Sequence, residues 1–305
     1  MTQPKIGVAL PTMDDITPLG PTGVARAARY AEAIGVDALG VADVLLGDGS
    51  VSLEPVVVLA TAAAVTERVA LDFGVLSVPT RPLAMLAAQV HTLQYLSGNR
   101  IRLGLGIGGF PGSPFWQALD APERGRGRLL DTALDLLPSL LAGKPTALPD
   151  AAALTFAPAV AVPPLLVGCG TGEPLLRRIA TRADGWLASA LTPDELRTVV
   201  TRLRELAAEA GRPAPRIHVG LHSVLGTQPE DDEDRTEMNR VVGEFFGMPE
   251  KHVEAVTITG TPEQAAARLT EYAQAGADQI ALGFNSRDYF CQLDLLGDAL
   301  ALLPH

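Results

Sequence analysis

The sequence predicts a (β/α)8 TIM barrel that forms a single domain. Eight short apolar runs, each followed by an amphipathic helix, are spread over 305 residues. Parallel strands buried on both faces are apolar throughout, as most of these runs are. Eight such units in this length fit one barrel with insertions. The alternative, a doubly wound open sheet, needs a topological switch point and usually has fewer strands.

The strands are expected where aliphatic and β-branched residues form an uninterrupted run bounded by turn residues. In chain order they are Lys5–Leu10, Ala38–Ala42, Val69–Leu76, Ile101–Ile107, Leu165–Gly168, Gly185–Ser189, Arg216–Leu225 and Gln279–Leu282. Pro11 ends the first run, and the tripeptide 97–99 (Ser-Gly-Asn) separates the third helix from the fourth strand. These breaks are typical of short β/α connections.

The helices are expected where apolar residues recur at helical spacing. They are Gly23–Ile34, Pro55–Thr66, Pro82–Leu96, Glu123–Leu141, Pro174–Arg182, Pro193–Ala210, Pro262–Ala275 and Tyr289–Leu303. Gly35 ends the first helix and Pro82 begins the third, as glycine and proline commonly do. A proline- and alanine-rich connection, Lys144–Pro164, precedes the fifth strand. Within the domain 1–305, the segment at about 228–255 is predicted to be an insertion, and it opens with the acidic run Glu230–Asp234.

The composition limits which partners the protein is expected to bind and in which cellular compartment it is expected. The net charge is −11, which disfavours electrostatic binding of nucleic acid or an anionic membrane. No apolar run reaches the length of a membrane span, and the N-terminal stretch lacks the layout of a signal peptide, so a cytoplasmic protein is expected. Cys169 and Cys291 are the only cysteines, too few for a disulfide framework and without metal-site spacing.

In a barrel of this kind the chemistry lies at the carboxyl ends of the strands. After the fifth strand, glycines lead directly into a helix N-terminus, where N–H groups and the helix dipole favour an anion. The candidate phosphate-binding residues are Gly168, Cys169, Gly170, Thr171 and Gly172. The carboxylate of Glu173 opposes this interpretation unless it points away. The alternative is a tight turn without a ligand.

A second group of glycines, Gly106, Gly108 and Gly109, lies at the carboxyl end of the fourth strand. No helix opens directly after it, so a dinucleotide fingerprint is not present. Bare backbone at this place suits a flat ring resting on it. A simple loop is the alternative.

Two ionisable side chains are expected near the mouth of the barrel. Asp43 ends the second strand and either caps the segment after it or lies near a ligand. His222 lies at the carboxyl end of the seventh strand, on the same side as His218 by alternation, and is either a histidine bonded to backbone or a catalytic group. His91 lies on its helix far from any strand end and is expected to be structural. No metal-binding spacing is found.

Several motifs along the chain are similar, in sequence and in order, to those of the bacterial-luciferase-like family of flavin-dependent oxidoreductases. They are Gly35-Val36-Asp37-Ala38-Leu39-Gly40-Val41-Ala42-Asp43, Thr66-Glu67-Arg68-Val69 through Gly74-Val75-Leu76, Leu96-Ser97-Gly98-Asn99-Arg100 with Leu103-Gly104-Leu105-Gly106-Ile107-Gly108, Ala183-Asp184-Gly185-Trp186, and Gly260-Thr261-Pro262-Glu263 with Ala275-Gly276-Ala277-Asp278. The resemblance spans most of the chain.

The resemblance implies a barrel that binds FMN or the deazaflavin coenzyme F-420 in its mouth. The flavin ring would lie against the third-strand end, Gly74, Val75 and Leu76, and against the fourth-strand end, with the phosphate on Gly170–Gly172. The family's non-prolyl cis peptide would join Gly74 to Val75.

The chain departs from the family's patterns at three positions, and the first two departures disfavour an alcohol- or sugar-oxidising dehydrogenase. Val44 stands where deazaflavin-dependent dehydrogenases of the family have a histidine, and Gly109 where they have a catalytic glutamate. Ile107 replaces a phosphate-clasping arginine of the luciferases.

We therefore expect a monooxygenase that uses reduced FMN and O2 on a hydrophobic small molecule, with Asp43 and His222 as the candidate catalytic residues. The cofactor supplies this chemistry and the protein supplies orientation. A separate flavin reductase is the expected partner. Whether the protein also forms a homodimer is left open at this point. The alternatives are hydride transfer to an unsaturated substrate with coenzyme F-420, and a non-catalytic flavin-binding protein.

Overall fold

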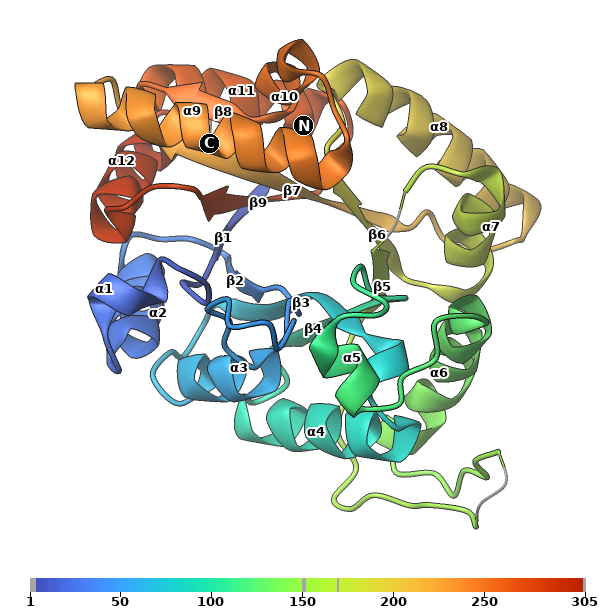
Figure 1. Cartoon of the computed structure of the whole chain (residues 1–305). Coiled ribbons are helices and arrows are strands. Elements are labelled where there is room, and N and C mark those ends of the chain that lie inside the picture. The colour runs from blue at the N-terminus through green and yellow to red at the C-terminus, as the bar shows by residue number, and fades with distance from the viewer. Residues whose placement is uncertain (1–3, 150–151, 169, 304–305) are drawn as a thin grey trace.

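Nine parallel strands of the described chain form one sheet, and eight of them, all except β8, close into a barrel that helices surround (Figure 1). The computed structural model describes residues 4–149, 152–168 and 170–303. The strands are β1 Lys5–Ala9, β2 Ala38–Val41, β3 Ala70–Ser77, β4 Ile101–Gly106, β5 Leu165–Gly168, β6 Gly185–Ser189, β7 Arg216–Leu225, β8 Ile258–Gly260 and β9 Gln279–Phe284. In the sheet, β9 lies between β1 and β7, and the pairing of β6 with β7 closes the ring. The barrel prediction is confirmed.

The helices follow the strands in the expected order. They are α1 Ile16–Leu19, α2 Gly23–Ala33, α3 Pro55–Ala63, α4 Leu83–Leu96, α5 Pro114–Ala118, α6 Arg126–Leu141, α7 Glu173–Arg182, α8 Pro193–Glu209, α9 Pro229–Phe246, α10 Glu250–Val256, α11 Pro262–Gln274 and α12 Tyr289–Ala301, with a 3-10 turn at Val78–Thr80. The helix expected from Glu123 begins only at Arg126, after Gly125 in the left-handed region at φ 70°. In the described chain no helix is both long enough and apolar enough to cross a membrane.

The segment at about 228–255 forms α9 and most of α10, and the strand after it was not predicted. Strand β8 has three residues and pairs only with the last three residues of β7, Ser223–Leu225. Met238 and Val242 of α9 pack with Val253 of α10 and Val224 of β7 in a small cluster separate from the main core. Helix α9 is therefore fixed to the carboxyl end of β7.

Three aspartates join neighbouring strands at the amino end of the barrel. Asp37 accepts the N–H of Ile6 at 2.8 Å, and Asp278 accepts that of Ile217 at 2.8 Å. Asp184 accepts the N–H of Leu165 at 2.9 Å. Each aspartate comes just before a strand and binds the first residues of another, so it helps to fix the register between them. The aspartates of the family-like motifs are thus part of the barrel framework.

Candidate functional site

Asp43 follows β2 in an almost completely buried ion pair that the sequence did not reveal. Its carboxylate accepts two hydrogen bonds from Arg81, one of them at 3.3 Å, and one from the N–H of Ser77 at 2.9 Å. Arg81 also donates to Glu54 at 3.0 Å. Burial alone would lower the pKa of Arg81, but its bonds to the two carboxylates raise it. This arrangement ties the end of β2 to the end of β3.

The end of β3 carries the peptide that the family resemblance singled out. The bond between Gly74 and Val75 is cis, as expected. The pairing of β3 with β4 shifts register between Phe73 and Leu76 at the same place. Val75 is half-buried and Leu76 fully buried, so the Val75 side chain is the one that reaches the mouth.

The glycines that end β4 and β5 make room for Val75. A Cβ added at Gly106 would lie 2.6 Å from Cγ2 of Val75, and one at Gly168 would lie 2.3 Å from its Cγ1. Both distances are far below the 3.5–4.0 Å at which carbon atoms pack. The sequence suggested that bare backbone here faces a flat ring. The structure fills this space with the Val75 side chain, which then covers the two glycines.

Gly108 and Gly109 differ from each other in what surrounds them. Gly108 has φ 73°, and a Cβ there would lie 2.4 Å from the ring of the buried Trp116. Nothing lies within 4 Å of a Cβ at Gly109. Arg126 donates to the carbonyls of Ile107 and Gly108 at 3.0 and 2.8 Å, so an arginine from the start of α6 holds this loop.

The turn between β5 and α7 is open to solvent. Gly170, Thr171 and Gly172 are exposed, and a Cβ at Gly170 would meet nothing within 4 Å. Gly172 caps the ten-residue helix α7 without a side-chain hydrogen bond. In its first turn Pro174 has no N–H, and those of Leu175 and Leu176 donate to the carbonyl of Gly172, so the N–H of Glu173 is the helix donor that remains beside those of residues 170–172. The predicted contact at Cys169 lies outside the described residues. This geometry suits an anion at the turn.

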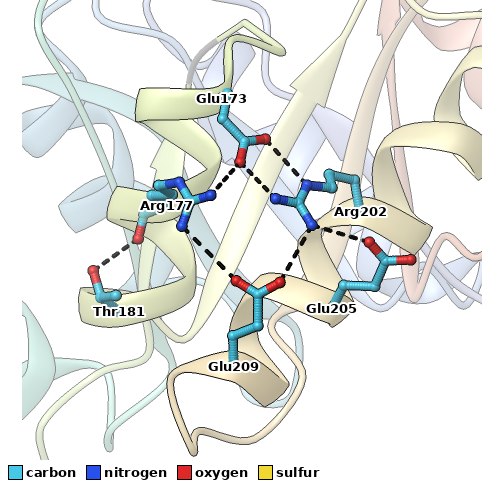
Figure 2. Close-up of polar contacts among 6 residues, drawn as sticks. All are labelled: Glu173, Arg177, Thr181, Arg202, Glu205 and Glu209. Atoms are coloured by element: carbon cyan, nitrogen blue, oxygen red, sulfur yellow. Dashed lines mark hydrogen bonds and ion pairs between the residues drawn. The ribbon is translucent and has the colours of Figure 1, made fainter.

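The side chain of Glu173 points toward Arg202 of α8 (Figure 2). Its carboxylate binds Arg202 of α8 at 2.7 Å and Arg177 at 2.8 Å. These bonds, that to Arg202 above all, lower the pKa of Glu173 and offset its charge. The objection that Glu173 raised against an anion at this turn is thereby weakened. The two cations are shared in turn with Glu209.

His222 reaches the mouth from β7. Its Nδ1 lies 2.8 Å from Oδ1 of Asn285, an atom that only accepts hydrogen bonds, so Nδ1 carries the proton and Nε2 is the acceptor. Burial lowers the pKa of His222, partly opposed by the bond to Asn285. The ring also meets the edge of Phe246 at 6.5 Å between centroids. The imidazole is therefore neutral at pH 7, with its second nitrogen able to accept a proton.

Aromatic residues of α9 meet the loop after β4 above the strand ends. Phe245 lies 5.9 Å from Phe110 and 4.8 Å from Phe246, measured between ring centroids. Phe245 is 59% exposed, and Ile107, three residues before Phe110 in the same loop, is 41% exposed. These side chains make the mouth apolar on the side of β4 and β7.

The site residues that the sequence suggested fall into separate groups. Val75 lies against Gly106 and Gly168, whereas no described contact joins Asp43 to His222, and β1 and β9 separate their strands. Sequence reasoning missed Arg81 and Asn285, because nothing local marks a residue as the partner of a distant one. His91 does have a structural role, since its Nε2 bonds the carbonyl of Pro158 at 2.7 Å. Within the described chain no three His, Cys, Asp or Glu side chains are grouped to hold a metal.

Comparisons with known proteins identify relatives of this chain. An uncharacterised protein of Mycobacterium tuberculosis is 36% identical over 178 residues, which cover 56% of this chain and 60% of that protein. This chain therefore spans less than two thirds of that relative. The 5,10-methylenetetrahydromethanopterin reductase of Methanopyrus kandleri is 24% identical over 282 residues, or 74% of this chain and 80% of the reductase.

Solved structures show the same fold at low sequence identity. An F420-dependent secondary alcohol dehydrogenase, bound to an F420–acetone adduct, superposes over all of both chains with TM-score 0.81 and 16% identity. The FMN-bound oxygenating constituent of 3,6-diketocamphane monooxygenase from Pseudomonas putida gives TM-score 0.75 and 16% identity over 99% of this chain and 100% of that one.

A family model described as luciferase-like monooxygenase matches residues 5–279. This range includes all strands but the last five residues of β9, and with them the site residues except Asn285. The family consists of flavin- and F420-dependent oxidoreductases and monooxygenases. The chain belongs to the luciferase-like monooxygenase family.

Proposed function

We propose that the protein is a monooxygenase that uses reduced FMN and O2 to oxidise a hydrophobic small molecule. The observation that carries the proposal is the mouth of the barrel, where an apolar Val75 side chain lies between two glycine-ended strands beside an exposed, glycine-lined helix N-terminus. The first is suited to a flat apolar ring and the second to a phosphate.

The residues present fit the FMN group. Gly170, Thr171 and Gly172 would hold its phosphate through N–H groups and a hydroxyl, since the turn is open and Glu173 is paired elsewhere. Val75 would support the ring. When bound, reduced FMN supplies the electrons that activate O2. The chain's own part is to orient the substrate and to exclude water.

The protonation states at the mouth favour oxygen transfer over alcohol oxidation. Oxidation of an alcohol needs a base for the hydroxyl proton. Asp43 is held by Arg81, and the pKa of His222 is lowered. Val44 and Gly109 add no ionisable group. The exposed apolar residues Ile107 and Phe245 beside the strand ends favour an apolar substrate.

A specific observation favours a second candidate, hydride transfer with coenzyme F-420 to an unsaturated substrate. The Methanopyrus reductase matches 74% of the chain, and a structure of the F420-dependent tetrahydromethanopterin reductase from the same organism superposes with TM-score 0.76 and 19% identity. Reduction of an unsaturated bond also needs no strong base on the protein. The two candidates differ in their cofactor and in their need for O2.

Cofactor titration and O2 consumption together test the proposal. Purified protein is titrated anaerobically with FMN, reduced FMN and coenzyme F-420, and the dissociation constants are compared. We expect tightest binding of reduced FMN, and O2-dependent oxidation of an apolar substrate panel when a separate reductase supplies it. Tighter binding of F-420 with O2-independent turnover would establish the second candidate instead. Binding of FMN without any turnover would leave a flavin-binding protein.

The phosphate position has its own test. We expect Gly170→Val to weaken FMN binding with little loss of stability, since a Cβ at this position has open space. Glu173→Gln is the matched comparison, because it changes the charge beside the turn without filling it. Unchanged FMN affinity of Gly170→Val would move the phosphate elsewhere. Arg177 and Arg178 are poor alternatives, since they pair with Glu173 and Asp131.

We also infer a homodimer through the outer faces of α3 and α4. Neither helix contains a charged residue, although the chain carries a net charge of −11. Two copies can approach there without repulsion between like charges. Val57, Met85 and Leu96 are 64%, 56% and 65% exposed on these helices. Light scattering should give the dimer mass for the wild type and the monomer mass for Val57→Glu/Met85→Glu. A wild-type monomer would refute the inference.

A further inference from the structure

At the end of the barrel opposite the mouth lies a cavity of about 220 Å³, here named the basal cavity. It is lined by Lys5, Arg102, Pro164, Leu166, Asp184, Arg216, His218, Asp278 and Gln279. These residues stand at or just before the starts of six strands. The proposed flavin site uses none of them.

Two polar atoms of the lining residues are buried without any partner. They are Nη2 of Arg102, a donor, and Oε1 of Gln279, an acceptor. The other ends of both side chains are fixed by Asp72, which accepts from Nε of Arg102 and from Nε2 of Gln279, each at 2.6 Å. Since Asp72 can only accept from the Gln279 amide nitrogen, the orientation of that amide is determined. Buried polar groups normally have partners, so an occupant that matches both atoms must accept from Arg102 and donate to Gln279.

Three cationic side chains, Lys5, Arg102 and Arg216, line the cavity. Burial, with smaller contributions from the charges of Arg102, Arg216 and Lys5, lowers the pKa of His218 to about 3. His218 is thus neutral and offers one N–H. Among the described residues, Lys5 and Arg216 form no ion pair. The positive charge they bring to the rim is therefore not neutralised by direct contact.

Three carboxylates act against an anion: Asp184 and Asp278 at the rim, and the buried Asp72, which offsets the charge of Arg102. Asp184 and Asp278 also line the cavity, and each uses one oxygen to accept a strand N–H, from Leu165 and Ile217 respectively. Asp184 and Asp278 are exposed, as are Lys5 and Arg216, so solvent screens all four charges, whereas Gln279 and His218 are 2% and 5% exposed. The balance allows an anion of modest affinity at the inner end of the cavity.

We propose that the basal cavity binds a small oxyanion that carries its own hydroxyl, of which monohydrogen phosphate is the simplest. Its oxygens would accept from Arg102 Nη2 and from the His218 N–H, with Lys5 and Arg216 nearby. Its hydroxyl would donate to Oε1 of Gln279. Sulfate has the same shape but no hydroxyl at neutral pH, so it would leave the Gln279 oxygen unpaired. An unpaired buried acceptor weakens binding by roughly 5- to 150-fold.

Calorimetric titration and thermal unfolding of the full chain with inorganic phosphate and with sulfate, at matched ionic strength and pH 7.5, test this. We expect phosphate to bind at least about tenfold more tightly than sulfate and to raise the unfolding temperature. The variant Lys5→Gln/Arg216→Gln should weaken phosphate binding by about tenfold or more. Arg29→Gln/Lys251→Gln is the charge-matched control, since both residues are exposed and lie outside the cavity lining.

One more variant distinguishes phosphate bound in the basal cavity from phosphate bound at the mouth. Phosphate binding that survives in Gly170→Val but falls in Lys5→Gln/Arg216→Gln belongs to the basal cavity. Equal affinity for phosphate and sulfate would overturn the role of Gln279 and with it the proposal. Undiminished phosphate binding in Lys5→Gln/Arg216→Gln, or no binding to the wild type, would leave the cavity as a water-filled part of the barrel.

Discussion

The fit of Val75 between two glycines gives the sharpest stability prediction, the effect of Gly168→Ala. The new Cβ would lie 2.3 Å from Cγ1 of Val75, about 1 Å inside normal carbon contact. Val75 cannot turn away easily, because its β-branched side chain is stiff about χ1 and its other methyl group lies over Gly106. We expect Gly168→Ala to lower the free energy of unfolding by about 1–3 kcal/mol, as overpacking usually does.

Removing the obstructing methyl groups should reverse most of this loss. In the double variant Gly168→Ala/Val75→Ala the new Cβ enters space that Val75 has left. The coupling between the two substitutions should therefore be stabilising, in the range of about 0.5–3 kcal/mol found for residues in contact. Urea denaturation of the wild type, both single variants and the double variant gives this coupling from the midpoints and slopes.

Gly40→Ala is the matched control. Gly40 is also a strand glycine, on β2, but a Cβ there would meet its nearest atoms at 3.9 Å. We expect its effect on unfolding to stay within about 0.5 kcal/mol. If Gly168→Ala were as stable as Gly40→Ala, or if Val75→Ala failed to rescue it, the glycine would not be there to admit Val75. The reasoning that makes Val75 the support of the flavin ring would then fail too.

Three further predictions concern ionisable groups. Arg81→Met should lower the free energy of unfolding by about 3–5 kcal/mol in urea, because it leaves Asp43 buried and unpaired; a loss below about 1 kcal/mol would contradict this. His222→Ala should reduce turnover about 10²–10⁴-fold with unchanged FMN affinity if Nε2 takes a proton, while a smaller loss with raised KM would mean that it only orients the substrate. His218 has a folded pKa of about 3 against 6.5 when unfolded, so only the unfolded chain takes up its proton as the pH falls below 6.5. Stability is therefore complete above 6.5 and should fall by about 1.4 kcal/mol per pH unit below it, a slope that His218→Asn should lack; parallel curves from pH 7 to 5 would disprove this.

The fold could be predicted from the sequence because its strands are continuous apolar runs with helices between them. Strand β8 was missed because three residues carry no periodicity, and it forms only as an extension of β7. The motifs that identify the family also describe the barrel more than its chemistry. Asp37, Asp184 and Asp278 bind strand N–H groups, and Arg100 donates to the carbonyls of Ala63, Thr66, Val69 and Ser97.

The site could be predicted only where it depends on local backbone. The glycines before α7 are a local feature of the sequence, and the resemblance to the family implied the cis peptide at Gly74. The pairing of Asp43 with Arg81 spans 38 residues and that of His222 with Asn285 spans 63. Such pairs are brought together by closure of the barrel, so no spacing rule reveals them.

These two pairs limit the reaction that the mouth can support. A reaction that removes a proton from an alcohol needs a base, and Nε2 of the neutral His222 is the candidate base at the mouth. Its lowered pKa makes it a weak base that accepts a proton only if the developing imidazolium is stabilised, and Asn285 is its one described hydrogen-bond partner. In oxygen transfer and in reduction of an unsaturated bond, the cofactor supplies the chemistry, so neither reaction needs a strong base on the protein. In the proposed site, the distinction between reduced FMN and coenzyme F-420 would come from the fit of the ring against Val75 and of the phosphate at Gly170–Gly172, and cofactor titrations of the Val75→Ala and Gly170→Val variants test this.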